Sequence, residues 1–369
     1  MNGPWVEVDL KTLDENIRRV NDVLRPGTSA IFVVKADAYG HGLGPVVQRA
    51  AKAGIQWFAV AYLHEAVAVR NAAPDANILV IGAVDPSMTQ VMIEQRITPV
   101  VVSEEHGAAL STEAQKKGAR LAVHLKVDTG MGRLGLPWDH AAEIFTRLSA
   151  APGLDLQGLC THFASIELKK PSLGPTQMER FAVVDREIAR IAGRRLFRHV
   201  SSSRAILYHA DWDMDGIRPG ILLYGYGSNE RGMRFHTRPF LQWKTRVAQA
   251  KKVPADFRVG YYSTYVTPAP TTIVTLAVGY ADGYNRMLSN KGFVLIHGRR
   301  CPVVGRVSMN WISADAGPDA DVKMGDEVVL MGTQGQEAVW ADELARLAKT
   351  IPYEILTGIK AGLDHHYLT

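Results

Sequence analysis

Lys35 is the first residue whose type and position suggest chemistry. It ends the apolar, β-branched run AIFVV and is followed at once by Ala-Asp-Ala-Tyr-Gly. A lysine at a strand end is commonly a solvated charge. A lysine amine that is partly removed from water, however, has a lowered pKa and can act as a nucleophile. The segment alone leaves both interpretations open.

Other polar residues follow the ends of later strand-like runs. Lys126 and Arg133 come at and after the end of LAVHLKVD, and His162 ends LDLQGLCTH. Taken singly, each has an ordinary structural explanation, such as a partly buried core histidine. In a barrel of parallel strands, however, the carboxyl ends of the strands meet on one face, where barrel enzymes carry their active sites. We therefore expect these three side chains to lie near Lys35.

The last two runs of this series carry a candidate phosphate site. FRHVSSS ends in Ser203, and GIRPGILLYG contains Arg218, Gly220 and Tyr224. The serines could simply cap a helix and the arginine could form a surface ion pair. Barrel enzymes, however, frequently bind phosphate in the loops after strands seven and eight. A nucleophilic lysine, a phosphate site and an arginine on one face together indicate pyridoxal phosphate, which is held by a Schiff base and by its phosphate.

The elements that must position these residues alternate from residue 30 to about residue 225. Amphipathic segments such as QMERFAVVDREIARIAG separate eight apolar, strand-like runs: AIFVVK, WFAVA, NILVIGA, ITPVVVS, RLAVHLKVD, LDLQGLCTH, FRHVSSS and GIRPGILLYG. This alternation predicts an α/β fold, a (β/α)8 TIM-type barrel, with a doubly wound sheet as the alternative.

After Tyr226 the pattern changes. The runs TTIVTLAVG, GFVLIHG, CPVVGRVSM and DEVVLMG follow one another across turns, and ADELARLAK is the one helical pattern near the end. We expect a barrel domain over residues 1–228 and a mostly antiparallel β domain over residues 229–369, with RGMRFHTRP as the connector. The strand WVEVDL could belong to either domain, so residues 1–9 could pair with the β domain.

Composition narrows the class of protein. Of the 369 residues, 47% are hydrophobic and 21% are charged, and no stretch is apolar enough to span a bilayer. The start MNGPWVEVDL does not resemble a secretory signal, and Cys160 and Cys301 match no zinc or redox spacing. The net charge of +5 is dispersed, without a basic arm. We expect a cytoplasmic enzyme with two buried, reduced thiols, no metal site and no nucleic-acid or membrane partner.

The segment DTGMGRLG suggests a different reading. Gly130, Gly132 and Gly135 form G-x-G-x-x-G after a strand-like run, as in dinucleotide-binding folds. That fingerprint requires a helix to begin at the glycines, so that its N-terminus meets the pyrophosphate. Here Leu136-Pro137-Trp138 pushes the helix start further along the chain. We therefore expect the glycines to shape a loop that places Arg133 beside an anion.

A resemblance to a known family rests on eight ordered motifs, VVKADAYGHG, VDTGMGRLG, THFA, IRPGILLYG, VGYYSTY, GYADGYNR, GRVSMNW and IPYEILTGI. In this order and spacing they resemble the bacterial alanine racemases over nearly the whole chain. The resemblance implies an isomerase that interconverts L-alanine and D-alanine, a peptidoglycan precursor, by two bases acting on a pyridoxal-phosphate aldimine. It also implies a homodimer with shared active sites. The alternative is a related racemase for serine, lysine or another amino acid.

The resemblance assigns roles by position. Lys35 would form the aldimine and act as one base, and Tyr261 of the partner subunit would act as the other. His162 would link that tyrosine to Arg218, which would face the cofactor's ring nitrogen. The residues that match the cofactor's phosphate site are Tyr39, Ser203, Gly220, Ile221 and Tyr353.

The substrate side follows in the same way. Arg133 and Met309 of the partner subunit match positions near the substrate carboxylate, and Lys126 matches a lysine that is carbamylated in some members and orients Arg133. The entrance corridor would contain Tyr280, Arg286 and Arg306. Three positions depart from the family's common residues, namely Ser202 for Asn, Asn310 for Asp and Ser165 for a smaller residue. These departures concern cofactor affinity and tolerance for larger substrates.

Overall fold

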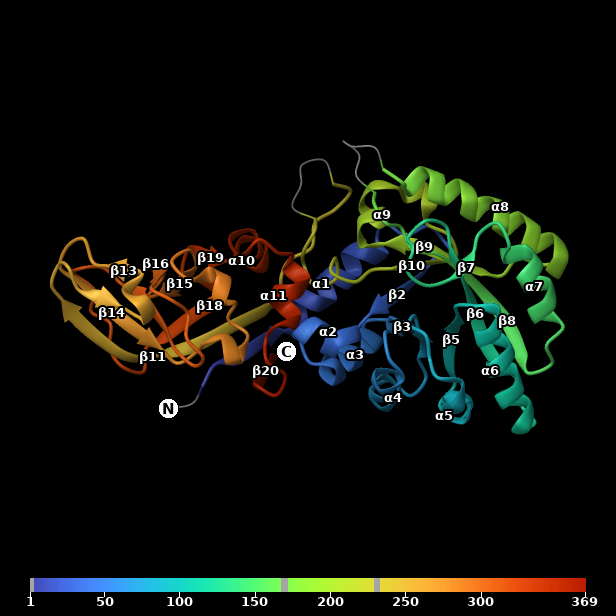
Figure 1. Cartoon of the computed structure of the whole chain (residues 1–369), viewed down its shortest axis with the longest axis horizontal. Coiled ribbons are helices and arrows are strands. Elements are labelled where there is room, and N and C mark those ends of the chain that lie inside the picture. Colours follow the sequence, from blue (N-terminus) through green and yellow to red (C-terminus); the bar gives the residue numbers. More distant parts are fainter. Residues whose placement is uncertain (1–2, 167–171, 229–232) are drawn as a thin grey trace. The chain divides into compact units, whose positions relative to one another are not determined.

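The computed structural model describes residues 3–166, 172–228 and 233–369, which form two compact units (Figure 1). One unit comprises Leu13–Ala38 and Leu43–Arg238, and the other comprises Met1–Thr12, Tyr39–Gly42 and Pro239–Thr369. Residues 229–232 lie outside the described residues. The domain boundary expected after residue 228 adjoins this gap, and the expected connector RGMRFHTRP begins inside it.

Eight parallel strands form the closed barrel of the first unit. Their order is β5-β4-β3-β2-β10-β9-β8-β6, and β5 also pairs with β6. The strands are β2 (Ser29–Val33), β3 (Trp57–Val60), β4 (Asn77–Val80), β5 (Ile97–Val101), β6 (Leu121–Asp128), β8 (Leu154–Cys160), β9 (Phe197–Ser202) and β10 (Gly216–Arg218). A two-residue strand, β7 (Leu136–Pro137), pairs with the end of β6. Because helices cover these strands outside and side chains fill the barrel inside, the strands are nearly continuous apolar runs.

Helices follow the strands around the barrel (Figure 1). They are α1 (Leu10–Asn21), α2 (Lys35–Gly40), α3 (Leu43–Lys52), α4 (Leu63–Ala72), α5 (Thr89–Glu94), α6 (Glu104–Lys116), α7 (Ala141–Ser149), α8 (Gly174–Ala192) and α9 (Ser203–Tyr208), with short 3-10 turns η1 (Pro86–Met88) and η2 (Ala210–Trp212). Their ends follow local chemistry. Ser103 accepts a hydrogen bond from the His106 amide at the start of α6, and Gly193 ends α8 in the left-handed conformation.

The eighth barrel strand is shorter than the sequence pattern indicates. The apolar run GIRPGILLYG contributes only Gly216–Arg218 to the sheet, and residues 221–225 form turns. Pro219 has no amide proton for a ladder, and the Leu223 amide bonds instead to the Gly220 carbonyl at 2.9 Å. The chain therefore leaves the sheet directly after Arg218.

The second unit is a mostly antiparallel β domain. Its sheet order is β19-β18-β15-β16-β17-β14-β11-β1-β20, and the additional pairing of β18 with β11 closes part of it into a ring. The strands are β1 (Trp5–Asp9), β11 (Leu241–Val253), β14 (Thr271–Leu276), β15 (Phe293–Ile296), β16 (Arg299–Val304), β17 (Ile312–Asp315), β18 (Glu327–Gln334), β19 (Glu337–Val339) and β20 (Asp364–Leu368). The barrel and this β domain confirm the predicted fold class.

Smaller elements complete the β domain. They are the hairpin β12 (Arg258–Val259) and β13 (Tyr265–Val266), the helices α10 (Ala341–Ala348) and α11 (Pro352–Thr357), and the turns η3 (Tyr261–Ser263), η4 (Tyr280–Asp282) and η5 (Arg286–Leu288). The strand at the start of the chain, β1, pairs antiparallel with β11 and parallel with β20. WVEVDL therefore extends the sheet of the β domain.

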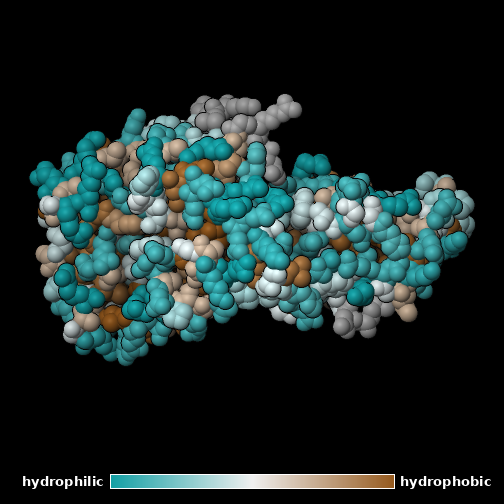
Figure 2. Space-filling model, turned by 180° about the vertical axis from the view of Figure 1, so that it is seen from behind, coloured by the Kyte–Doolittle hydropathy of each residue, from teal (hydrophilic) through white to brown (hydrophobic). Residues whose placement is uncertain are grey.

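The face of the molecule in Figure 2 is mainly hydrophilic, with hydrophobic side chains in small groups between polar ones. Within the described residues, no helix has both the length and the apolar character needed to cross a membrane. Cys160 and Cys301 are both buried and free, as expected from the sequence.

Candidate active site

Lys35 lies at the carboxyl end of β2, where the backbone takes an unusual path. Residues 36 to 39 all have φ between 51° and 53°, so α2 is a left-handed turn made of residues other than glycine. Burial lowers the pKa of the Lys35 amine, and the Arg133 charge lowers it further, while the Glu65 carboxylate opposes both. The strand end therefore carries an amine that loses its proton more readily than a solvated lysine.

The structure brings four cationic side chains and one histidine together at this end of the barrel. Burial lowers the pKa of Lys126, and Arg133, Arg218 and Lys35 lower it further, while Cys160 opposes them. Burial and the same cations lower the pKa of His162 to about 3. His162 is therefore neutral at pH 7. The expected neighbourhood of Lys35, Lys126, Arg133 and His162 is present in the fold.

Asp128 shapes the loop that carries Arg133. Its carboxylate accepts hydrogen bonds from the amides of Gly130, Met131 and Gly132 at 2.8–3.1 Å. Burial alone would raise the pKa of Asp128, but these amide hydrogen bonds lower it. The next long helix, α7, begins only at Ala141. The glycines thus shape a loop and do not open a helix, as the sequence predicts.

Arg218 is buried and bonded to neutral groups. Its Nη2 donates to the carbonyls of Thr161 and Val200 at 2.6 and 3.0 Å, and its Nη1 donates to the His199 carbonyl and lies 2.8 Å from His199 Nδ1. In the described part of the chain, neither a carboxylate nor any other acceptor contacts Nε. One N–H of this buried cation is therefore available to a ligand.

Two histidines behind Arg218 are site residues that the sequence analysis missed. His199 Nε2 lies 2.8 Å from His124 Nδ1, and both rings are fully buried. Burial and the Arg218 charge lower the pKa of His124 to about 4, so the pair is neutral at pH 7. A signal was available, since His124 and His199 interrupt the apolar runs LAVHLKV and FRHVSS at strand positions that face the barrel interior.

The candidate phosphate residues of the barrel also meet. Ser203, the first residue of α9, accepts hydrogen bonds at Oγ from the amides of Gly220 and Leu222, at 2.9 and 3.3 Å. Ile221 lies between these two amides and is buried. Ser203 thereby fixes the loop after β10 to the start of α9. The Ser203 hydroxyl, a buried guanidinium and a lysine amine of lowered pKa are donors of the kind that pyridoxal phosphate requires, so these residues fit that cofactor.

Tyr39 and Tyr353 form a pair within the second unit. Their ring centroids are 5.8 Å apart, and Tyr39 is nearly buried while Tyr353 is more than one-third exposed. Burial, and then Tyr353, raise the pKa of Tyr39. The Tyr39 hydroxyl therefore stays protonated at neutral pH and could donate a hydrogen bond to an anion, as the predicted phosphate role requires.

The remaining candidates lie on the β domain and present large side chains to solvent. Tyr261 is 66% exposed and Met309 is 55% exposed. The Tyr280 amide bonds to the Ser308 carbonyl at 3.0 Å, which holds the segments of Tyr280 and Met309 side by side. Arg286 opens the neighbouring turn η5. The guanidinium of Arg306 stacks on Tyr262 at 4.9 Å, next to Tyr261 in the chain.

Asn290 holds the segment that follows Tyr261. Its amide nitrogen donates to the Thr264 hydroxyl at 3.2 Å, and its amide oxygen accepts from the Gly305 amide at 2.6 Å. Tyr262 has φ 61° and Ser263 has φ 48°, so this turn is also left-handed at residues other than glycine. The exposed tyrosine is therefore carried by a fixed, strained turn.

Comparisons with known proteins decide the family. The family model described as alanine racemase, N-terminal domain, matches residues 8–228, and the one described as alanine racemase, C-terminal domain, matches residues 240–367. The chain is 39% identical over 364 residues to an alanine racemase of Halothermothrix orenii, covering 98% of this chain and 96% of the relative. The chain belongs to the alanine racemase family.

Solved structures of the family are similar over the whole chain. An alanine racemase from Bacillus anthracis with bound L-Ala-P has a TM-score of 0.92 at 32% identity, with 100% of this chain and 96% of that chain covered. One from Bartonella henselae with covalently bound pyridoxal phosphate has a TM-score of 0.90 at 27% identity, with both chains fully covered. The resemblance inferred from the eight motifs is thus confirmed.

Of the three departures from common racemase residues, Ser165 alone has a side-chain hydrogen bond described in this structure. Ser202 precedes α9 and makes no capping hydrogen bond with its side chain. Ser165 Oγ accepts from the Leu173 amide at 3.0 Å, so it fixes the entry to α8. Asn310 is exposed beside Met309.

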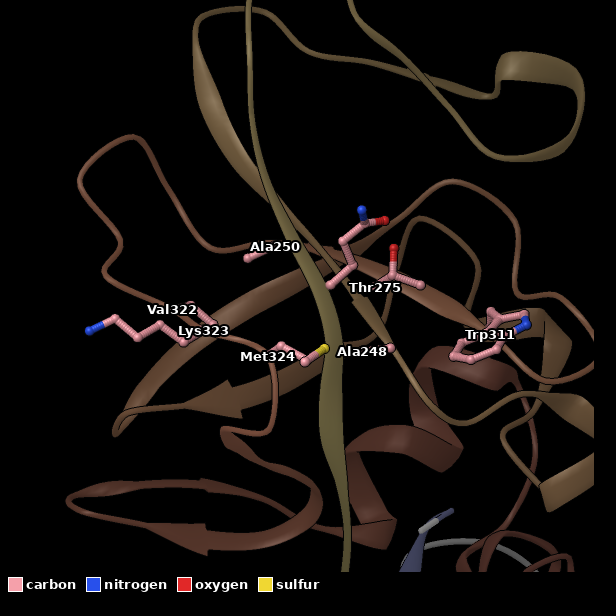
Figure 3. A pocket seen from close by; sticks show the side chains of 8 residues that line it. Ala248, Ala250, Thr275, Trp311, Val322, Lys323 and Met324 are labelled. Atoms are coloured by element: carbon pink, nitrogen blue, oxygen red, sulfur yellow. The ribbon is translucent and has the colours of Figure 1, made fainter. Parts of the chain in front are cut away.

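A hollow of about 670 Å³ on the β domain contains none of the candidate site residues, although Trp311, the last residue of the motif GRVSMNW, lines it (Figure 3). It is lined by Ala248, Gln249, Ala250, Thr275, Trp311, Val322, Lys323 and Met324. It offers one lysine amine and no other titratable group, so we assign it no part in the candidate site.

Proposed function

We propose that this protein is an alanine racemase that interconverts L-alanine and D-alanine with pyridoxal phosphate as its cofactor. The observation that carries the proposal is that a lysine amine of lowered pKa, Lys35, and a buried arginine without a carboxylate partner among the described residues, Arg218, both act on the same two groups, Lys126 and His162. Family membership and the fit of the donor set to the cofactor support it.

The residues that would hold the cofactor follow from the motif positions and from the site geometry. Lys35 would bind it covalently, Arg218 would donate from Nε to its ring nitrogen with His162 nearby, and its phosphate would contact a set of hydroxyls and amides contributed by Tyr39, Ser203, Gly220, Ile221 and Tyr353. When bound, pyridoxal phosphate withdraws electron density from the α-carbon of the amino acid and so makes the α-proton acidic.

Arg218 would limit that withdrawal. An arginine does not give up its proton in proteins, so Arg218 would donate a hydrogen bond to the ring nitrogen without protonating it. An aspartate or glutamate in its place could supply a proton to the ring nitrogen, which would strengthen the electron withdrawal and favour transamination. Arg218 would therefore favour racemisation over transamination.

Racemisation requires proton transfer on both faces of the α-carbon. Lys35 would serve one face, and its lowered pKa suits it to accept a proton near neutral pH. Tyr261 of the partner subunit would serve the other face. His162, neutral at pH 7, could accept a hydrogen bond from that tyrosine hydroxyl and so favour loss of its proton.

A homodimer with shared active sites is part of the proposal. The strong exposure of Tyr261 and Met309 supports it, because large side chains carried on rigid turns can reach a second chain. Within this arrangement the barrel domain would bind the cofactor, and the β domain would complete the active site of the partner. A cytoplasmic location belongs to the same proposal and is supported by the two free, buried thiols.

The substrate carboxylate would contact Arg133 and Met309 of the partner subunit. Lys126 is buried among Lys35, Arg133 and Arg218, and its Nζ reaches only the Ile81 carbonyl at 3.5 Å among the described residues. Carbamylation would convert this amine into an anion that pairs with Arg133, which is why we include it. The entrance would be formed by Tyr280, Arg286 and Arg306.

The test is to incubate the protein, loaded with pyridoxal phosphate, with L-alanine in deuterated water and to follow chirality and α-deuterium together. D-alanine carrying α-deuterium is the expected result. Serine and lysine, run in parallel, separate this proposal from a related racemase of other specificity. Absence of both exchange and inversion with all three substrates would refute the proposed function.

A further inference from the structure

The turn after Lys35 needs a partner to hold its shape. Residues 36 to 39 are left-handed, a conformation in which the Cβ atom crowds the following carbonyl oxygen. Within the turn, the Ala38 amide bonds to the Val34 carbonyl at 2.9 Å, and Asp37 accepts from the Leu43 amide at 2.7 Å. Neither bond fixes the peptide between Lys35 and Ala36.

That peptide is held by Glu65. Glu65 Oε1 accepts from the Ala36 amide at 2.6 Å, and Oε2 accepts from the amides of Ala61 and Tyr62 at 2.9 and 3.0 Å. Glu65 is 8% exposed, whereas Ala36 and Tyr62 are exposed, so the carboxylate is buried and its three hydrogen bonds are partly buried. A single buried carboxylate thus joins the carboxyl end of β2 to that of β3.

The bonds to Ala61 and Tyr62 have an ordinary explanation, because Glu65 occupies the third position of α4 and caps its N-terminus. The bond to Ala36 does not belong to a helix cap, since it reaches 29 residues back along the chain. Glu65 is also the negative charge that acts on the Lys35 amine, opposite the positive charge of Arg133. Lys126 and His162 are the other titratable groups that interact with Lys35.

We propose that Glu65 is a positioning residue for Lys35, which holds the first peptide of the left-handed turn and contributes a negative charge that acts on the amine. The proposal rests on the proposed function for the role of Lys35 as a base. A carboxylate is needed because each of its oxygens must accept from amides that face it, and a side-chain amide would turn an N–H toward one of them.

Two variants separate charge from reach. Glu65→Gln keeps the length of the side chain and removes the charge, while Glu65→Asp keeps the charge and shortens the reach. Glu105→Gln is the matched control, because Glu105 lies in the first turn of α6 and is exposed. Competitive acetylation of the full chain without cofactor, read at Lys35 by mass spectrometry across pH, gives the midpoint of the amine titration. Racemisation of alanine by the loaded protein gives kcat and KM, and thermal melting reports stability.

In Glu65→Gln the Lys35 midpoint should fall, because an opposite charge has been removed. In Glu65→Asp it should stay near that of the unchanged protein. In both variants kcat should fall by about tenfold or more, because the base is misplaced, with little change in KM. If Glu65→Gln does not fold, Glu65→Asp decides by its kcat.

If both Glu65 variants have the same kcat as Glu105→Gln, the proposal is overturned, whatever their melting temperatures. Glu65 would then be only a cap of α4. An unshifted midpoint in Glu65→Gln would overturn the charge component. If the unchanged protein does not racemise alanine, the proposed function is refuted instead. The two failures can be told apart because the acetylation midpoint of Lys35 does not depend on turnover.

Discussion

Replacing Arg218 with glutamate should change the outcome of the reaction as well as the stability of the barrel. The buried carbonyls of Thr161, Val200 and His199 each accept a hydrogen bond from the Arg218 guanidinium. An unpaired buried polar group costs about 1–3 kcal/mol, so three of them cost roughly 3–9 kcal/mol. A loss of about 3 kcal/mol should lower the melting temperature of a domain of this size by roughly 6–12 °C.

The chemical effect should be separable from that loss. Burial raises the pKa of a carboxyl group, so a glutamate at position 218 would hold a proton and share it with the cofactor's ring nitrogen. Transamination should then rise relative to racemisation. The assay follows pyruvate and the aminated cofactor alongside D-alanine, at a temperature at which the variant is folded.

Arg70→Glu is the matched control. Arg70 is also buried and donates to four backbone carbonyls, those of Pro74, Ala76, Gln95 and Arg96. These lie before β4 and β5, away from the carboxyl ends of the strands. This control should lose comparable stability without producing pyruvate. If Arg218→Glu forms no more transamination product per racemisation event than Arg70→Glu, our account of Arg218 is wrong.

Three further outcomes follow from the same site. Tyr261→Phe should leave the visible absorption of the Lys35-bound cofactor in place while α-deuterium exchange proceeds without inversion; loss of the cofactor would instead make Tyr261 structural. Asn290→Ala should lower kcat by releasing the turn that carries Tyr261, and an unchanged kcat would show that the turn holds without it. Stability should fall as pH drops from about 6.5 toward 4, because His124 and His162 have lowered pKa values when folded and bind protons more readily when unfolded. Thermal melts of His124→Gln across this range should be flatter than those of the unchanged protein, and parallel curves would contradict the assignment.

The barrel strands were predictable because parallel strands that are covered on both faces are continuous apolar runs, and seven of the eight runs coincide with strands of four to eight residues. The eighth could not be bounded from hydrophobicity, since Pro219 removes a ladder hydrogen bond while the following apolar residues stay buried in turns. The long strand β11 was missed for the opposite reason. Its sequence LQWKTRVAQAKKV alternates apolar with polar and charged residues, which reads less clearly than an unbroken run.

In the candidate site, too, some residues could be found from the sequence pattern and others only from the tertiary structure. Lys35, His162 and Arg218 could be found because each stands at a strand end, where the barrel topology makes them converge. Glu65 looks like an ordinary helix-capping residue in the sequence, and its bond to Ala36 exists only once β2 and β3 are neighbours. The pairing of His124 with His199 depends in the same way on strand order, because 75 residues separate the two rings.

Backbone strain beside both proposed bases is the feature that sequence propensity predicts least well. A left-handed residue other than glycine costs about 1–2 kcal/mol, so the four after Lys35 cost roughly 4–8 kcal/mol. That is comparable to the whole stability of a typical domain, about 5–15 kcal/mol. Such a turn persists only if bonds such as those from Glu65 and Asp37 outweigh its cost. Tyr261 stands before a second left-handed turn, at Tyr262 and Ser263, that Asn290 holds. A base that must meet one face of one carbon gains from a rigid support, and strain fixed by hydrogen bonds supplies that rigidity at both positions.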